Sequence, residues 1–476
     1  ADAEMGDAES PVMAAKVLRN CRQPGARFAL FTLTGVNLLN FADRYVASSV
    51  KSLLKEDLNL TDAQTALPMT GMAVVYMICA LGFGLLVDRY HVDRRKVLAF
   101  GILLWSVATA LGALSQNLWQ LIFFRSLVGV GEAAYGVVAQ PMLSDFFPVH
   151  ERTMAFAMFN IAMPIGGALG YGIGGVLGSL CGWRIAFCAV GIPGIAVAAS
   201  MGFLMDPVRG VNDSPAAADK PERGFLSSLR TILTNGHWMF ATAGMIATVF
   251  AIGGLADWVE SFLERYKGVD LAHAGIAVGA ITALSGLVGN LLGAKVTLMA
   301  EPHRANAGFL VSALFMVPSA AFGCVMLNSP GDATTTYGVL LASEIFLWTY
   351  MSPMSNISIT AIPVNLRSTS SGLQIFLCHV LGDVISPPIV GVISDTRHSL
   401  RDGMQITWIM IVVAGLFWFV GYMVLPPLGT AAIDNAEEAK QRRPSTMWSL
   451  FCAPEPWDEE STTMDSSSES DHSEES

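Results

Sequence analysis

Apolar residues along this chain gather into long blocks that are separated by short polar segments. Each block holds about 20 residues, the length that an α-helix needs to cross a hydrocarbon core of roughly 30 Å. We therefore predict an all-α membrane protein with 12 transmembrane helices. The predicted helices run approximately over Arg27–Ser48, Thr65–Val87, Val97–Leu114, Trp119–Phe147, Thr153–Leu180, Trp183–Met205, His237–Phe262, His273–Met299, Asn306–Leu327, Ala333–Ile362, Ser368–Ser394 and Met404–Leu425.

A polar stretch rich in proline and charge, Asn212–Arg223, separates the sixth block from the seventh and is unsuited to spanning a bilayer. The blocks therefore divide into two halves of six helices. Ala-Asp recurs at a similar depth in the first and seventh blocks, as expected for two related, pseudo-symmetric halves. We predict a cytoplasmic N-terminal segment 1–26, an N-terminal half 27–205, a cytoplasmic linker 206–236, a C-terminal half 237–428 and a disordered acidic cytoplasmic tail 429–476.

The composition agrees with a membrane protein. Hydrophobic residues make up 53% of the chain and charged residues only 14%, against about 25% charged residues in soluble domains. Of the 28 lysines and arginines, 19 fall in segments assigned to the cytoplasm, 7 in outer loops and 2 in the membrane, which places both termini in the cytoplasm. The net charge of −11 comes largely from the tails, where serines beside carboxylates are either kinase sites or part of a solvated tail.

Cysteine and glycine patterns argue against enzyme chemistry. The seven cysteines are scattered singly, without the paired spacing of a metal or redox site, so no metal and no cofactor are expected. The glycine-dense fifth block lacks the preceding strand and the lysine of a phosphate loop. Its glycines recur every four residues and predict close helix packing, which we expect to form a sliding contact between a helix of each half. The ladder consists of Gly166, Gly170, Gly174 and Gly178.

Two full charges, Arg125 and Glu132, lie seven residues apart in the fourth block. Charges at this depth are rare and typically mark a substrate or ion pathway. About 10 Å along the helix axis separates the two, so each needs its own partner. We predict that Asp43 of the first block pairs with Arg125, whereas Glu132 lacks an evident cation and is a candidate for carrying a proton. Arg44 faces away from Asp43 and is assigned to the membrane surface or to a cavity rim.

The C-terminal half contributes fewer intramembrane polar groups. His379 and Asp383 are four residues apart on one helix and can bond each other, as a functional site or as a structural pair. Glu344 is expected to be buried, as a second titrating group or a contact for a choline-like cation.

Gly84-Leu-Leu-Val-Asp-Arg89 followed by Arg94-Arg-Lys96 resembles the signature of the major facilitator superfamily, although Tyr90–Asp93 replaces its tighter turn. The resemblance implies that superfamily's fold. A carboxylate at a helix end beside cations can latch two halves together, so Asp88, Arg89, Arg94 and Arg95 form a predicted cytoplasmic gate. Alternatively, the cations only enforce topology.

Further segments resemble the spinster family in the expected order and in helices one, four and eleven. They are Leu39–Tyr45, Arg125–Tyr135, Arg367–Thr369 and His379–Asp395. The resemblance implies a transporter, not an enzyme, for single-chain lipids such as lysophospholipids or sphingoid phosphates, in the lysosomal, late endosomal or plasma membrane. It also implies proton coupling through Asp43 and Glu132 and switching at Arg125; Arg44, Tyr135 and Glu344 complete the predicted headgroup site. We expect a monomer without nucleic-acid partners.

The mechanism expected from these residues is a competition. Asp43 and Glu132 compete for Arg125 or for protons until a phosphate head displaces one carboxylate, which is then protonated so that the halves can rock. Two alternatives remain open: a facilitator for a small organic anion, and a lipid sensor or scaffold that does not transport.

Overall fold

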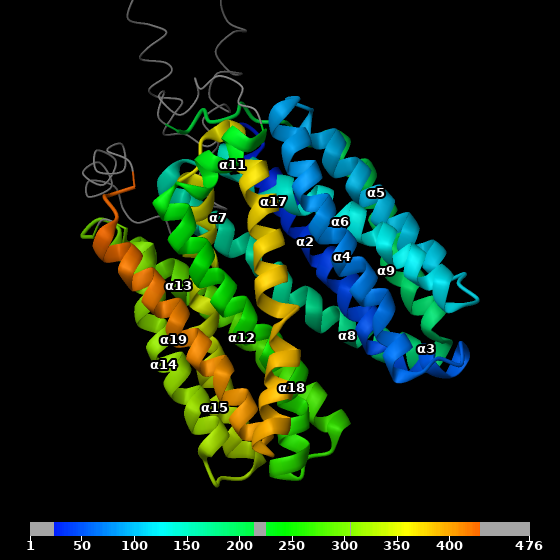
Figure 1. Ribbon diagram of the computed structural model, residues 1–476. Helices are drawn as coiled ribbons and strands as arrows, with labels where there is room; N and C mark the ends of the chain where they lie inside the picture. The colour runs from blue at the N-terminus through cyan, green and yellow to red at the C-terminus, as the bar shows by residue number, and fades with distance from the viewer. Residues whose placement is uncertain (1–22, 214–224, 305, 429–476) are drawn as a thin grey trace, which may run out of the picture.

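The computed structural model describes residues 23–213, 225–304 and 306–428 (Figure 1). All regular structure within these ranges is helical, as predicted. The predicted tail and all but the last four residues of the N-terminal segment lie outside the described residues. The helices are α2 (Ala26–Ser49), α3 (Lys51–Asp57), α4 (Asp62–Arg89), α5 (Arg94–Gly112), α6 (Leu118–Phe146), α7 (Val149–Asn160), α8 (Ala162–Cys181), α9 (Trp183–Ser200), η1 (Met201–Phe203), α11 (Phe225–Leu233), α12 (Gly236–Lys267), α13 (Leu271–Ala300), α14 (Ala307–Asn328), α15 (Ala333–Leu347), η2 (Trp348–Tyr350), α16 (Met351–Thr360), η3 (Val364–Leu366), α17 (Arg367–Cys378), η4 (His379–Asp383), α18 (Ser386–Arg397) and α19 (Leu400–Val424).

Within the described residues, 10 helical runs are long and apolar enough to cross a membrane. They correspond to ten of the predicted blocks. The other two blocks are also helical, as α2 and as the continuous run α15, η2 and α16. The count of twelve membrane crossings and the domain boundaries stay predictions.

Two of the predicted helices, the fifth and the eleventh, are interrupted near prolines. The fifth block divides into α7 and α8 at Ile161, three residues before Pro164. The eleventh contains a π-helical turn, η4, before the prolines that open α18. Proline lacks an N–H group and is tolerated in the first turn of a helix, where that group has no helical acceptor. These breaks redirect the helices within one span.

Each half buries its own apolar cluster. The cluster of the first half includes Trp105, Phe146 and Phe156, and that of the second includes Trp408 and Trp418. Ala294 and Ile359 of the second half also join the first cluster. The halves are therefore packed separately but share an apolar contact.

The glycine ladder of α8 packs inside one half, which corrects the expected sliding contact between halves. A Cβ atom added at Gly166 would lie 2.5 Å from the carbonyl oxygen of Leu38, and one at Gly170 would lie 2.5 Å from that of Ala42. Both carbonyls belong to α2 of the same half. The small residues thus let α2 and α8 approach backbone to backbone, and this interface holds α2 in place.

The two halves converge at one end of the bundle and diverge toward the other (Figure 1). We call these the linker end, where residues 206–213 lie, and the distal end, where α3 lies. At the linker end, the amide N–H of Thr369 donates to Asp88 Oδ2 at 2.6 Å, and Asn356 Nδ2 donates to Thr153 Oγ1 at 2.9 Å. Both bonds join the halves, so the linker end is closed by direct polar contacts.

Candidate functional site

Two ion pairs join α2 to α6 inside the first half. Arg125 Nη1 of α6 donates to Asp43 Oδ2 of α2 at 3.1 Å, and both side chains are at most 4% exposed. This confirms the pairing predicted from the sequence. A buried arginine without a carboxylate would be strongly destabilising, so Asp43 is the residue that allows Arg125 to lie inside the membrane.

Glu132 is paired, contrary to the prediction that it lacks a cation. Arg44 Nε donates to Glu132 Oε2 at 2.6 Å, and Arg44 Nη2 lies 2.5 Å from the same oxygen. Neighbouring residues of α2 point about 100° apart, which seemed to separate Arg44 from this site. However, Arg125 and Glu132 lie at different heights on α6. Asp43 therefore reaches Arg125, and Arg44 reaches Glu132.

Arg44 is the accessible member of this group. Its side chain is 23% exposed, whereas that of Glu132 is fully buried and that of Arg125 is 1% exposed. The Arg44 guanidinium also lies 4.8 Å from the centroid of the Tyr76 ring, in cation–π geometry. Arg44 is thus partly open to contact from outside the pairs, whereas Arg125, the expected docking point, is enclosed in this conformation.

Some polar atoms of the two pairs have no hydrogen-bond partner among the described residues. They are Glu132 Oε1, Asp43 Oδ1 and Arg125 Nε, all buried. Unsatisfied buried atoms are destabilising and call for an explanation such as a proton, a water molecule or a ligand. The two pairs can therefore accept further partners.

Tyr135 lies in a packing position. Its hydroxyl group donates to the carbonyl oxygen of Leu33 at 2.8 Å, and its ring meets Trp105 and Phe159. With a relative exposure of 2%, it is enclosed by the first half. This placement does not favour the headgroup contact expected for Tyr135.

The polar groups of the second half bond differently. Glu344 of α15 is buried and accepts a hydrogen bond from Ser285 of α13 at 2.9 Å. His379 Nδ1 lies 2.9 Å from Asp383 Oδ2, which confirms the predicted pair. The His379 ring also meets the Tyr76 ring of the first half edge-on, with centroids 5.6 Å apart. His379 therefore faces the interface between the halves, whereas Glu344 is held inside its own half.

At the linker end, only part of the predicted gate joins the halves. Asp88 accepts from α17, as described above, and Arg94 is buried between Asp145 and Asp206, 2.5 Å and 2.7 Å away. In contrast, Arg95 pairs with Asp93 on its own turn. Arg89 is exposed beside Tyr90. The neighbouring cations thus separate into buried connectors and surface residues.

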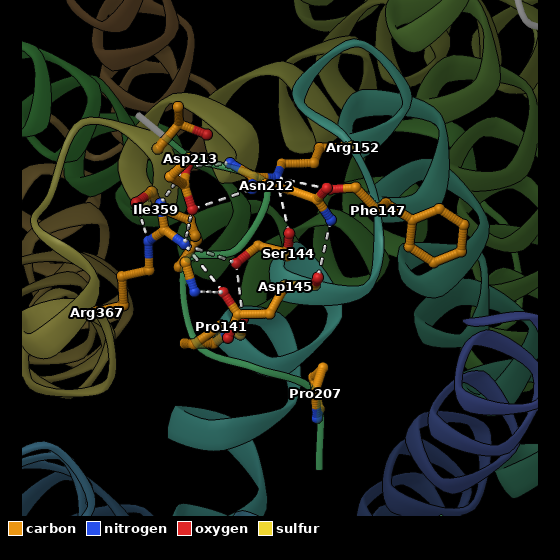
Figure 2. Close-up of polar contacts among 12 residues, drawn as sticks. Pro141, Ser144, Asp145, Phe147, Arg152, Pro207, Asn212, Asp213, Ile359 and Arg367 are labelled. Atoms are coloured by element: carbon orange, nitrogen blue, oxygen red, sulfur yellow. Dashed lines mark hydrogen bonds and ion pairs between the residues drawn. The ribbon is translucent and has the colours of Figure 1, made fainter. Parts of the chain in front are cut away.

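The central connector of the linker end is Asp213 (Figure 2). Its carboxylate accepts two hydrogen bonds from Arg152 of the first half, at 2.8 and 3.2 Å, and two from Arg367 of the second, both at 2.9 Å. Arg367 also reaches Asp145 Oδ1 at 3.3 Å. One aspartate of the linker therefore ties both halves together.

The charge of Asp213 follows from these neighbours. Burial opposes ionisation, but the Arg152 and Arg367 guanidinium groups outweigh it and hold the pKa of the Asp213 carboxyl well below its usual range. The carboxylate is accordingly ionised at physiological pH, as bidentate arginine contacts require.

Sequence reasoning missed Asp145, Arg152 and Asp213. Asp145 lies near the end of the long apolar run of α6, and a charge directly before Phe146 and Phe147 was a signal of burial. Arg152 similarly lies in the first turn of α7, directly before the apolar run of that helix. Asp213 carried no comparable signal, because its polar, proline-containing surroundings are typical of an exposed linker.

No group of three His, Cys, Asp or Glu residues that could hold a metal ion lies within 23–213, 225–304 and 306–428.

Comparisons with known proteins point in one direction. Residues 33–387 match the family description of the Major Facilitator Superfamily. Protein spinster of Drosophila melanogaster is 31% identical over 385 residues, which cover 77% of this chain and 62% of that protein. Spinster homolog 3 of Danio rerio is 30% identical over 386 residues, which cover 77% of this chain and 76% of that protein. A sphingosine-1-phosphate transporter of Danio rerio is 27% identical over 486 residues, covering 92% and 94%.

Solved structures agree on the fold. A bacterial homolog of the human lysosomal transporter spinster, inward-facing and occupied, superposes with a TM-score of 0.59 at 20% identity, covering 85% of this chain and 98% of that one. The transporter FucP in its outward conformation superposes with a TM-score of 0.66 at 14% identity, covering 83% and 99%. At these identities the likeness concerns the architecture.

Proposed function

The chain belongs to the spinster family of the major facilitator superfamily, a superfamily of membrane transporters, and we propose that it transports single-chain lipids with a phosphate-bearing head by alternating access. Lysophospholipids and sphingoid phosphates are the two candidate classes. Support for the sphingoid class comes from the sphingosine-1-phosphate transporter to which the chain is similar over 92% of its length. The observation that carries the proposal is the pair formed by Arg44 and Glu132 beside that formed by Arg125 and Asp43.

In the proposed mechanism, the phosphate head enters between the halves and meets Arg44. It takes over the guanidinium hydrogen bonds that Glu132 now accepts, because a phosphate provides more acceptor oxygens than one carboxylate. Glu132 is then an unpaired carboxylate in an apolar site, a state that favours proton uptake. Asp43 and Arg125 form the neighbouring ion pair, which acts as the second proton-coupled element. Substrate binding and protonation are thereby linked through one arginine.

The gate in this proposal is the linker end. Asp88, Asp145, Asp213 and Arg367 hold the halves together, and breaking these contacts lets the substrate leave on that side. We assign this end to the cytoplasm, because the positive charges of the loops gather there. The described conformation is then open away from the cytoplasm. We further propose that the protein works as a monomer in a lysosomal, late endosomal or plasma membrane.

The test is uptake of labelled lysophosphatidylcholine and sphingosine-1-phosphate into proteoliposomes, with and without a pH gradient. We expect flux of at least one lipid and acceleration by the gradient. Arg44→Gln should abolish it, whereas Arg184→Gln, at an arginine 42% exposed at the distal end, is the matched control. The proposed coupling of lipid transport to protons is refuted if Glu132→Gln and Asp43→Asn both leave the gradient-driven flux unchanged.

Glycerol 3-phosphate, which has a phosphate head but no tail, distinguishes lipid transport from the main alternative, transport of a small organic anion. Its transport in place of the lipids would indicate a small organic anion facilitator. Lipid binding without flux of any compound would instead indicate a sensor.

A further inference from the structure

We propose that Tyr76 is the positioning residue that transmits the state of Arg44 to the second half through His379. The proposal rests on the proposed function, because it describes how the same site signals that its substrate is bound. Tyr76 lies on α4 and meets one group on each side: Arg44 of its own half, 4.8 Å from the ring centroid, and His379 of the other half, 5.6 Å away. The phenol ring thus joins the accessible cation to the opposite half.

The position of Tyr76 along α4 explains how this residue can influence the opening of the linker end. Toward the linker end, α4 and α17 approach backbone to backbone: a Cβ atom added at Gly84 would lie 2.5 Å from the carbonyl oxygen of Ser368. Tyr76 lies two helical turns before Gly84, in the direction of the distal end. The aromatic contact therefore lies on the distal side of the tight helix contact along α4. The two halves diverge toward that end (Figure 1).

The ring is held in a restricted site. A Cβ atom added at Gly136 of α6 would lie 3.0 Å from the Tyr76 hydroxyl oxygen, so the absence of a side chain there makes room for the phenol. Arg44 covers the face of the ring, and His379 meets the ring nearly perpendicularly, at 82°. A displacement of Arg44 would free the ring face and change its packing against His379.

In the second half, His379 begins the π-helical turn η4, which ends at Asp383. Such turns occur within α-helices mostly at functional sites and have a winding that differs from their surroundings. Asp383 bonds His379 across this turn, and a Cβ atom added at Gly253 of α12 would lie 2.7 Å from Asp383 Cα. A movement of His379 is therefore passed to α12 through close backbone contact.

The sequence of events follows from these contacts. A phosphate head draws Arg44 from Glu132 and from the Tyr76 ring. The ring then repacks against His379, and the turn η4 shifts relative to α4 and α12. The contact between α4 and α17 near Gly84 loosens as a result, and the linker end opens. Tyr76 touches neither phosphate nor proton in this scheme, since its role is to position its neighbours.

The experiment measures opening and binding separately. Spin labels at the exposed residues His91 and His303, one in each half at the linker end, report the distance between halves by pulsed EPR in a cysteine-free variant. Lysophosphatidylcholine should increase the open fraction of the otherwise unchanged protein. Tyr76→Leu should bind the lipid with affinity within about threefold but reduce the ligand-induced shift about fivefold or more. Maximal flux should fall with little change in KM.

Tyr76→Phe keeps both ring contacts and should restore the shift. Tyr171→Leu is the matched control, since the Tyr171 ring pairs with Tyr45 inside one half, with centroids 5.1 Å apart; it should leave the shift intact. The proposal is overturned if Tyr76→Leu shows a normal shift, or if Tyr76→Phe is as defective as Tyr76→Leu.

A second measurement tests the link between Arg44 and Tyr76 without a bound lipid. The resting distance distribution is compared for Arg44→Gln, Tyr76→Leu and the double variant. Because both residues act on one path, the double variant should differ from the unchanged protein no more than the stronger single variant does. Fully additive shifts would overturn the link between Arg44 and Tyr76, whereas failure of lipid binding alone would overturn only the substrate assignment.

Discussion

The two halves of this protein place the carboxylates within their helices beside different partners. In the first half, Asp43 and Glu132 each bond an arginine, so two negative charges are compensated by two positive ones. In the second half, Glu344 bonds a serine hydroxyl and Asp383 bonds a histidine on its own helix. Arginine stays charged at any physiological pH, whereas a serine hydroxyl is neutral. The first half thus holds its carboxylates at fixed cations, whereas the second half holds Glu344 at a serine and Asp383 at a histidine of the π-helical turn η4.

This difference has a physical origin in desolvation. An ion buried without a partner is destabilised by several kcal/mol. The pairs of the first half avoid that penalty until a ligand separates them, which makes separation a controlled event. Glu344 has no guanidinium group to pair with at its contact with Ser285, so any change in its charge acts on the packing of α13 against α15.

The strongest test of charge compensation is Arg125→Met. The variant leaves Asp43 buried without its cation, so we expect a loss of about 3–5 kcal/mol in the free energy of unfolding and no measurable lipid flux. Thermal unfolding in detergent and proteoliposome uptake measure the two effects. The double variant with Asp43→Leu removes both charges and should regain most of the stability without regaining flux. A single variant as stable as the unchanged protein would contradict compensation in the first half.

The comparison between halves is sharpened by Glu132→Gln and Glu344→Gln. The first weakens a charge-assisted hydrogen bond with Arg44, worth about 1.5–3 kcal/mol, so flux should fall about 10- to 150-fold. The second keeps an oxygen that accepts from Ser285, so flux should fall less than about tenfold while its acceleration by a pH gradient weakens. Uptake at several gradients measures both. Equal effects of the two substitutions would remove the proposed difference.

An effect of similar size, on the conformational equilibrium instead of on flux, is expected from Asp213→Asn, which tests a carboxylate shared by the halves. The variant loses charge-assisted bonds to Arg152 and Arg367, so the equilibrium should shift toward an open linker end by about 1.5–3 kcal/mol. The EPR distance between His91 and His303 reports this shift. Asp206→Asn is the control, because Asp206 bonds Arg94 of the first half. A distance distribution unchanged by Asp213→Asn would refute the latch.

The pH response of this latch follows from the depressed pKa of Asp213. Its stabilising contribution is present above the ordinary pKa of aspartate and is lost only as the pH falls through the lower pKa of the closed state. Between about pH 5 and 8, the contribution of Asp213 to closure should therefore stay constant.

The smallest expected effect concerns Glu301, just beyond α13 at the linker end. Burial raises the pKa of its carboxyl to about 7, against an opposing bond with Thr153 of the first half. The closed state then binds the proton more tightly than the open state, so closure is favoured below about pH 4.5 and loses that advantage progressively up to about pH 7. Since the residue is partly exposed, we expect about 1–3 kcal/mol over this range.

Glu301→Gln should flatten this pH profile of the EPR distance, whereas Asp213→Asn should lower the closed fraction at every pH. A profile that keeps its slope in Glu301→Gln would assign the response to another group.

Much of this architecture could be predicted from local information. Block length and loop charge predicted the helices and the linker, because the bilayer imposes a fixed length on any span. Spacing within one helix also predicted the pair of His379 and Asp383, since residues four apart share a face. The pairing of Asp43 with Arg125 was predicted from the need to compensate a buried charge, although the residues are far apart in the sequence.

Other features depended on how helices cross. The sequence by itself determined that Asp43, Arg125 and Glu132 would lie deep in the first half, that these charges would need partners, and that a glycine ladder would bring α8 close to a neighbour. Only the tertiary structure decided that Arg44 reaches Glu132, that the ladder faces α2, and that Asp213 enters between Arg152 and Arg367. The reason is geometric: the side-chain period determines which residues share a face, but crossing positions and the path of a linker arise from packing between distant segments.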